Sequence, residues 1–127
     1  MRYVVDPLQV EEWSLNRHTG VAAKLLADGQ NMTVLYTTWV AYAKAPEHTH
    51  MHEQMGLCLQ GEIVFVINGK DFLVKAGGFY HIPGNISHAE RNDRSEPAIL
   101  VDFFSPPRED LLQRRFDANT LDGKSVS

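Results

Sequence analysis

The sequence predicts an all-β domain, a sandwich or small barrel, with one short helix near its C-terminus. Glycine and proline recur at short intervals through the middle of the chain, and apolar runs rich in β-branched and aromatic residues lie between them. Such runs are typical of strands, and many short strands joined by regular turns are typical of sandwiches and barrels. Helical periodicity is almost absent from the same region. The predicted strands are 32–43, 55–60, 62–67, 71–74, 79–82, 86–91 and 98–105.

A two-residue turn is the clearest local signal in this pattern. Asn68 and Gly69 separate the predicted strands 62–67 and 71–74. An Asn-Gly pair between two strand-forming runs is the typical sequence of a type I′ turn, because both residues tolerate a positive φ. The pair therefore predicts a β-hairpin.

One short helix is predicted over residues 108–116. Pro106 and Pro107 precede it, its first turn is acidic and its last turn is basic. Proline is favoured at a helix start, and this distribution of charge stabilises the helix because it opposes the helix dipole.

Length and composition describe one ordinary globular domain. The chain has 127 residues, 43% of them hydrophobic and 22% charged, with a formal net charge of −4. We assign residues 1–116 to a single domain and the polar, aperiodic residues 117–127 to a flexible tail. The sequence has no apolar run near the roughly 20 residues that span a bilayer, and its mild acidity offers no basic stripe for a phosphate backbone. We therefore expect neither a membrane nor a nucleic-acid partner.

The N-terminus and the cysteine content favour a cytoplasmic location. The first seven residues lack the apolar core of a signal peptide. The one cysteine, Cys58, lies in an apolar stretch. It cannot form an internal disulfide, and we expect a buried thiol.

The most informative feature is a cluster of three histidines within five residues. His48, His50 and His52 alternate with other residues. On an extended strand, side chains two residues apart point the same way, so these three could share one face. Imidazoles on one face are a common beginning of a site for zinc, iron, nickel or copper. The alternative is a solvated, histidine-rich loop.

Two blocks of regularly spaced residues include these histidines. The residues are His48, His50, Gln54 and Gly61 in the first block, and Gly77, Pro83, His88 and Asn92 in the second. Their order and spacing resemble the paired motifs of the cupin superfamily, HxH(x)3-4E(x)6G followed by G(x)5PxGxxH(x)3N. The resemblance covers residues 46–92 and implies a cupin-type jelly-roll barrel.

The resemblance also implies one divalent metal ion, held by His48, His50, Gln54 and His88. His52 stays open as a further ligand, a donor behind the ligands or a rim residue. Zinc, nickel, manganese or iron would suit these donors, and zinc or nickel is favoured.

Two positions depart from the family pattern. Asn85 stands where glycine is usual, which is a mild change because asparagine tolerates the left-handed conformation. Gln54 stands where glutamate is usual. Three neutral imidazoles and a neutral amide leave a divalent ion with its full charge, which favours Lewis-acid chemistry over the redox cycling of a dioxygenase.

A second group of residues lies near the end of the last predicted strand. Alternation places Asp102 and Phe104 on one face, and Arg108, after the two prolines, could reach back toward that face. A buried aspartate is costly unless it is paired or functional. A structural Asp102–Arg108 ion pair is therefore the alternative to a catalytic role.

Together with the HxHxHEQ stretch, these residues resemble KdgF-type small cupins, which act on 4,5-unsaturated uronates from pectin or alginate breakdown. The resemblance implies that Asp102, Phe104 and Arg108 serve catalysis. Asp102 would move protons during enol-to-keto conversion, Arg108 would bind the substrate carboxylate, and Phe104 would shape the pocket wall.

Two other functions stay open. The many apolar and aromatic residues near the motifs also suit a polyketide cyclase, in which a histidine-bound ion promotes an aldol-type ring closure. In that case His81 or His52 could carry protons, although a structural histidine is the simpler interpretation of His81. The third candidate is a cupin that binds a small ligand without catalysis. A small molecule is the expected partner in all three cases.

The resemblance also predicts a homodimer, since family members commonly pair through edge strands. The segment 4–15, which contains Trp13, is a candidate for such an edge. An exposed strand edge is a physical reason for pairing with a second copy.

Overall fold

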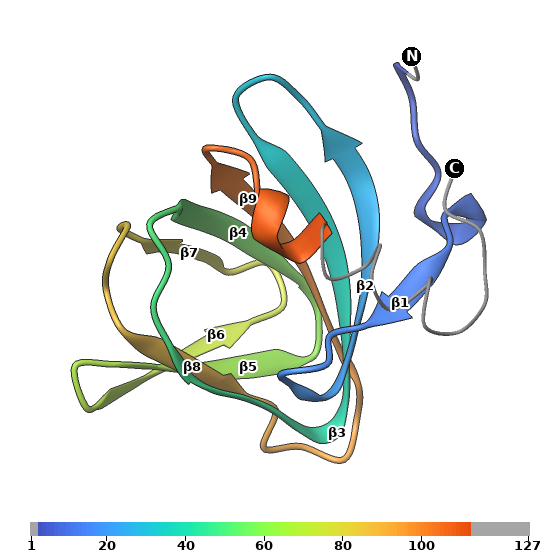
Figure 1. The fold of residues 1–127 in the computed structure, drawn as a ribbon. Coiled ribbons are helices and arrows are strands. Elements are labelled where there is room, and N and C mark those ends of the chain that lie inside the picture. The colour runs from blue at the N-terminus through green and yellow to red at the C-terminus, as the bar shows by residue number, and fades with distance from the viewer. Residues whose placement is uncertain (1–2, 113–127) are drawn as a thin grey trace.

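The computed structural model describes residues 3–112 and shows an antiparallel β-barrel (Figure 1). Within that range nine strands form one connected sheet. The all-β prediction is confirmed. In chain order the elements are the 3-10 helix η1 (Pro7–Gln9) and the strands β1 (Glu12–Ser14), β2 (Thr19–Asp28), β3 (Thr33–His48), β4 (Glu53–Gln60), β5 (Glu62–Ile67), β6 (Lys70–Lys75), β7 (Phe79–Ile82), β8 (His88–Arg91) and β9 (Ala98–Ser105).

Strand β3 joins the two halves of the sheet, whose order is β6-β5-β8-β3-β9-β4-β7. Its first half pairs with β2 and β9, and its last residues, from Lys44 to His48, pair with β8. Tyr42, with a φ of 60°, lies between the two parts. The order brings strands that are far apart in the sequence, such as β4 and β9, side by side, as Figure 1 shows.

The predicted hairpin and the predicted helix both form. Asn68 and Gly69 have φ values of 53° and 74°, as a type I′ turn requires, and they connect β5 to β6. Residues 109–112 are helical, and the Leu112 amide donates to the Arg108 carbonyl at 3.2 Å. The rest of the predicted helix and the predicted tail, 117–127, lie outside the described residues.

Strand β2 is the longest element that the sequence did not predict. Its residues, TGVAAKLLAD, include alanine, leucine and lysine, which favour helix in isolation. In the barrel it pairs antiparallel with β3 and buries Val21 and Ala23. Tertiary pairing therefore overrides the local preference.

Two apolar clusters occupy the barrel interior, and polar residues lie between them. The larger cluster includes Trp39 and Leu100. The smaller one contains Leu35, Phe104 and Leu111, the last of these from the C-terminal helix. The inward positions between the clusters, along β3 and β9, are Thr37 and Asp102.

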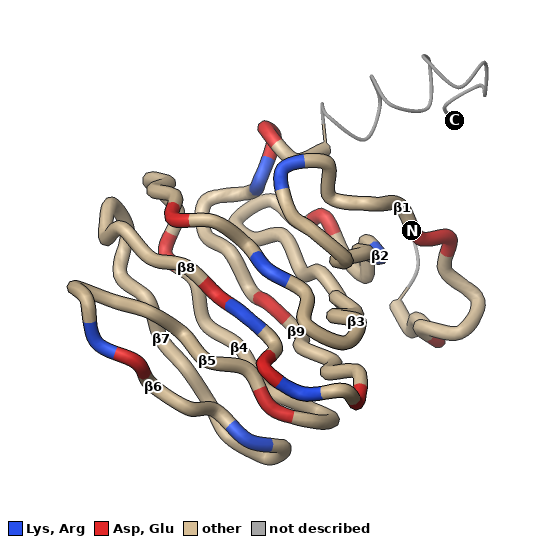
Figure 2. The backbone as a smooth tube through the Cα atoms, turned by 90° about the horizontal axis from the view of Figure 1, so that it is seen from below, with Lys and Arg blue, Asp and Glu red and all other residues tan. Residues whose placement is uncertain are grey.

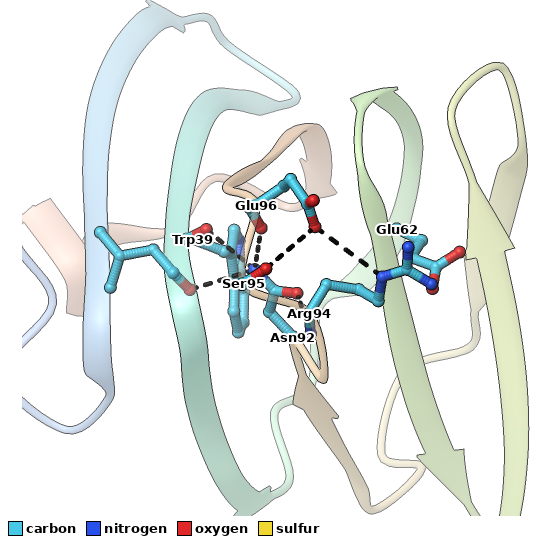
Figure 3. Close-up of polar contacts among 7 residues, drawn as sticks. Trp39, Glu62, Asn92, Arg94, Ser95 and Glu96 are labelled. Atoms are coloured by element: carbon cyan, nitrogen blue, oxygen red, sulfur yellow. Dashed lines mark hydrogen bonds and ion pairs between the residues drawn. The ribbon is translucent and has the colours of Figure 1, made fainter.

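Asn92, the last residue of the second motif block, has a structural role (Figure 3). Its side chain is 1% exposed, and its Nδ2 donates to the carbonyls of Trp39, Val40 and Glu96 at 3.2, 3.1 and 2.9 Å. Its Oδ1 accepts from the Arg94 amide at 2.9 Å. Asn92 thus fastens the β8–β9 turn to β3, because it satisfies backbone groups that would otherwise be buried without partners.

Acidic and basic residues are interleaved along the chain (Figure 2). Arg91, for example, pairs with Asp71 at 2.8 Å and with Asp93 at 2.9 Å. Among residues 3–112, no helix has the length and apolar character that crossing a membrane requires.

Candidate metal centre and active site

Three histidines from two separate parts of the chain meet in the folded structure. His48 ends β3 and is the registered partner of His88 in β8, while His50 lies two residues beyond β3. One ligand atom from each lies within 4.8 Å of the others. The sheet register therefore brings together the predicted ligands of the two motif blocks.

The hydrogen bonds of these rings leave one nitrogen of each free to bind a metal. In every case Nδ1 meets a backbone carbonyl: His48 contacts Pro46 at 2.7 Å, His50 contacts His52 at 3.0 Å, and His88 contacts Ile86 at 2.8 Å. This contact places the ring proton on Nδ1, so the lone pair on Nε2 is the one available to a metal. Within the described residues, the buried Nε2 atoms of His50 and His88 have no hydrogen-bond partner. These residues therefore fit a divalent metal ion.

The environment also keeps the imidazoles in the form that binds a metal. Burial, followed by the nearby Arg108 guanidinium and His88, lowers the pKa of His50 to about 4. Burial likewise lowers the pKa of His48 and of His88. The lowered pKa values favour the neutral form of the rings, which is the form that binds a metal.

Asp102 accepts hydrogen bonds from three neighbouring side chains. Gln54 Nε2 donates to Asp102 Oδ1 at 3.0 Å, and the Tyr80 hydroxyl donates to the same oxygen. Thr37 is the third donor, and it accepts from Trp39 Nε1 at 2.9 Å. Burial raises the pKa of Asp102 to about 6, although the hydrogen bonds from Tyr80 and Gln54 lower it. The site thus holds a buried carboxyl whose orientation is fixed.

Arg108 forms an ion pair with Asp110, so the alternative Asp102–Arg108 pair is not what the structure shows. Arg108 Nε and Nη2 donate to the two Asp110 oxygens, both at 2.9 Å. The guanidinium carbon lies 4.6 Å from the centre of the Phe104 ring, in cation–π geometry. Arg108 hydrogen bonding lowers the pKa of Asp110 to about 2, although burial acts in the opposite direction. The helix start therefore holds Arg108 in place through a residue only two positions away.

Two histidines that the sequence offered are not members of the three-histidine cluster. The His52 ring centre lies 5.7 Å from that of His50, but His52 is not among the three histidines whose ligand atoms lie within 4.8 Å of one another. Its Nε2 lies 4.0 Å from Asp110 Oδ1. His81 points out of the barrel, because its neighbours Tyr80 and Ile82 are the inward positions of β7. His81 Nε2 forms a 2.8 Å ion pair with Glu53 on the outer surface. We therefore remove His81 from the catalytic set and His52 from the ligand set.

Glu90 is the main residue of this site that the sequence interpretation missed. It is 5% exposed, and its Oε1 lies 3.5 Å from His88 Nε2 without forming a hydrogen bond. Burial and the proximity of Asp102 raise its pKa to about 8. Its alternation with His88 and Asn92 along β8 was the signal that could have placed it inside.

These groups surround a cavity of about 240 Å³. Arg17, exposed at the surface, contributes a second guanidinium that the sequence interpretation also missed. The polar lining includes His48, His50, Gln54, Glu90, Asp102, Arg108 and Asp110, and the apolar lining includes Leu15, Leu35, Trp39, Phe104 and Leu111.

Comparison with known families identifies the fold. The model of the cupin domain matches residues 36–104, which is more than half of the chain. The chain belongs to the cupin family. The predicted cupin barrel is thereby confirmed, and the three-histidine cluster lies where the two motif blocks of the cupin meet.

Two curated relatives share part of this cupin sequence. The cupin is 30% identical over 91 residues to the HTH-type transcriptional regulator PuuR of Escherichia coli (strain K12), a match that covers 68% of this chain and 49% of the regulator. The chain thus spans about half the length of that relative. It is 27% identical over 94 residues to the pectin degradation protein KdgF of Dickeya dadantii (strain 3937), with 73% of this chain and 84% of KdgF covered.

Solved structures show the same cupin fold. KdgF from Halomonas sp. superimposes with a TM-score of 0.76 at 20% identity, covering 87% of this chain and 98% of that one. The polyketide cyclase RemF from Streptomyces resistomycificus gives a TM-score of 0.77 at 16% identity, covering 83% and 80%. At these identities the likeness shows the fold alone.

Proposed function

We propose that this cupin is a metal-dependent enzyme that opens and ketonises 4,5-unsaturated uronates. The observation that carries the proposal is that a buried carboxyl, Asp102, and a guanidinium, Arg108, line the same cavity as two of the clustered histidines, His48 and His50. The relationship to the pectin degradation protein KdgF supports the same reaction class.

Arg108 is the group placed to bind the substrate carboxylate. Asp110 occupies the guanidinium edge formed by Nε and Nη2. A guanidinium has five N–H donors, so the edge containing Nη1 remains for a second carboxylate, in a bidentate arrangement. The Phe104 ring beneath it and the Asp110 carboxylate beside it hold that edge in position.

Asp102 is the group placed to move the proton. Opening of the sugar hemiacetal breaks the bond between C1 and the ring oxygen and leaves an aldehyde at C1 and an enol at C5. The enol hydroxyl then loses a proton, C4 gains one, and the C4–C5 double bond becomes a carbonyl at C5, so the composition is unchanged. Tyr80, Gln54 and Thr37 orient the Asp102 carboxyl for this transfer.

His48, His50, His88 and the Gln54 amide would hold the metal. When bound, a divalent ion supplies Lewis-acid polarisation of a substrate oxygen. Donation from Gln54 Nε2 to Asp102 directs the amide nitrogen toward the carboxyl, which leaves the amide oxygen as the atom suited to a metal.

The size and lining of the cavity favour a small acid over an aromatic polyketide. At about 240 Å³ the cavity is smaller than the roughly 300–1,000 Å³ typical of pockets for drug-sized ligands. Two guanidinium groups and one amide line it beside four carboxyl groups, and the guanidinium groups suit the carboxylate of a uronate.

Two specific observations keep the other functions as candidates. Leu15, Leu35, Trp39 and Leu111 give the cavity an apolar wall that a cyclase substrate could use. The match to the regulator PuuR supports a ligand-binding cupin without turnover. Neither observation accounts for the fixed orientation of Asp102.

The test follows the ultraviolet absorbance of 4,5-unsaturated uronates incubated with the zinc- or nickel-loaded protein. We expect the absorbance to fall, and we expect a chelator to stop the fall and the metal to restore it. The control is free metal at the same concentration without protein. If the loaded protein leaves the absorbance unchanged, the uronate proposal fails. Calorimetric binding of the uronate without turnover would instead favour a ligand-binding cupin.

A further inference from the structure

We propose that Glu90 supplies the negative charge of the metal centre, a charge that residue 54, as glutamine, does not provide. The inference rests on the metal site of the proposed function and is independent of the proposed reaction. It changes the expected chemistry, because the ion would not keep its full charge.

The position of Glu90 is set by strand alternation. Residues two apart on β8 point the same way, and both His88 and Glu90 are buried inward positions. Glu90 Oε1 lies 3.5 Å from His88 Nε2, the nitrogen that is free to bind the ion. Glu90 is outside the group of three histidines whose ligand atoms lie within 4.8 Å of one another, so its charge would act on a bound ion from beside His88.

The other acids that line the cavity are engaged elsewhere. Asp102 accepts hydrogen bonds from Gln54 and Tyr80, and Asp110 pairs with Arg108. Glu47 is exposed and accepts from the Ser87 hydroxyl at 2.7 Å. Glu90 differs from them because its carboxyl lies 3.5 Å from a candidate ligand nitrogen, His88 Nε2.

The structure also gives a reason for an amide at position 54. Gln54 Nε2 donates to Asp102 at 3.0 Å. A glutamate there would direct a second carboxylate at Asp102, and two carboxylates at that distance repel each other. An amide at position 54, on β4, avoids this repulsion. Glu90, on β8, then supplies the negative charge that a glutamate at position 54 would have given to the metal ion.

Burial makes the charge of Glu90 useful to a cation. The site is enclosed, and a divalent ion held by neutral donors alone would be costly to bury. A carboxylate that is 5% exposed is also costly without a counter-charge. Each of the two therefore stabilises the other when the metal binds.

The test is a calorimetric titration of the metal-free protein with zinc and with nickel. We expect Glu90→Gln to weaken binding by about 10- to 100-fold, the range that ligand-supporting residues show. The control is Glu53→Gln, which removes the same charge from the outer surface and should change the affinity less than about twofold. Glu90→Gln with unchanged affinity would overturn the inference.

Two further measurements separate a charge effect from a folding defect. Glutamine has nearly the shape of glutamate, so we expect the melting temperature of metal-free Glu90→Gln to match or exceed that of the wild type. If that variant does not fold, Glu90→Asp is the second probe, and cobalt is the reporter ion. We expect the visible cobalt spectrum to change in Glu90→Asp and to stay as in the wild type in Glu53→Asp; an unchanged spectrum in Glu90→Asp would overturn the inference.

The titration distinguishes this inference from the proposed function. If the wild type binds no divalent metal, the metal site and the role of Glu90 fail together. If the wild type binds metal and Glu90→Gln binds it equally well, only the role of Glu90 fails. A metal-binding wild type that leaves uronates unchanged would overturn the reaction and leave the role of Glu90 to the affinity comparison.

Discussion

Asp102 has a fixed orientation because three donors surround it in the barrel interior. Tyr80 and Gln54 both donate to Oδ1, and Thr37 is the third donor. The carboxyl is 4% exposed and lines the cavity. A carboxyl held in this way can transfer a proton without the free-energy cost of first reorienting its side chain.

At this scale, Asp102→Asn should abolish turnover and spare the metal. Asparagine keeps the shape of the side chain but cannot carry the proton, so we expect kcat to fall by about 10²- to 10⁴-fold. The metal content should stay at the wild-type value, as measured by elemental analysis. More than a tenth of the wild-type kcat in the variant would show that Asp102 does not transfer the proton.

Asp110 should make a pH-dependent contribution to stability. Its folded pKa, about 2, lies below the ordinary value of 3.8, so the contribution is present above pH 3.8 and is lost as the pH falls toward 2. We expect Asp110→Asn to lower the free energy of unfolding at pH 7 by about 1 kcal/mol, a modest value because the carboxylate is partly exposed and screened. Urea denaturation of both proteins from pH 7 to pH 2 measures the difference. A difference that stays constant through pH 2 would contradict the assignment.

At the scale of elements, the crossing of Tyr80 over β4 connects three strands. Gly56 in β4 is the registered partner of both Tyr80 in β7 and Asp102 in β9. A Cβ atom at Gly56 would overlap the Tyr80 ring and hydroxyl. The glycine thus lets the Tyr80 side chain cross β4 and reach Asp102.

Gly56→Ala should therefore displace Tyr80 and destabilise the barrel. We expect the free energy of unfolding to fall by about 1–3 kcal/mol, the usual cost of overpacking, and kcat to fall as Asp102 loses a donor. The matched control is Gly29→Ala, where the nearest atom to a Cβ is the Met32 carbonyl oxygen at 3.4 Å. That variant should stay within about 0.5 kcal/mol of the wild type in urea denaturation. Equal effects at both glycines would rule out the proposed crossing.

At the scale of the whole molecule, a metal ion would join strands that are distant in the sequence. His48 and His50 come from the end of β3 and the loop after it, and His88 comes from β8. A ligand that binds only the folded state stabilises it. The metal is therefore expected to stabilise the folded state in addition to its role in catalysis.

Adding zinc or nickel to the metal-free protein should raise its melting temperature. At about 100 times the dissociation constant the gain is roughly 2.7 kcal/mol, or about 10 °C for a domain of this size. Calorimetric melting with and without chelator measures the shift. Magnesium, which prefers oxygen ligands, is the control and should give almost none. An absent shift with zinc, nickel, manganese and iron would contradict the metal site.

The N-terminal segment should form a homodimer interface. Among residues 3–112, β1 pairs with β2 alone, and the segment before it exposes Tyr3, Val4 and Leu8 by 90%, 87% and 81%. We expect light scattering to give the mass of a dimer for the full chain and of a monomer after deletion of residues 1–10. A full chain that stays monomeric at the highest protein concentration measured would contradict this expectation. The exposed edge strand would then not pair with a second copy.

Much of the barrel was predictable because strand signals are local. Alternation in Ala98–Ser105 placed Asp102 and Phe104 on the buried face, and Asn68-Gly69 specified its own turn. The spacing of His48, His50 and His88 was sufficient to identify the family, because the spacing of the motif residues reflects the lengths of the strands and turns between them. β2 was missed because its residues favour helix until β3 pairs with it.

The sequence by itself determined most of the strands, the hairpin and the histidines able to bind a metal. Only the tertiary structure decided which of those groups meet. The loop after β3 brings His50 into the cluster and leaves His52 next to Asp110, and β7 turns His81 outward. Register brings Tyr80 and Gln54 to Asp102, and alternation on β8 brings Glu90 to His88. The physical reason is that a side chain's face follows from its own strand, whereas its neighbours follow from how the whole sheet closes.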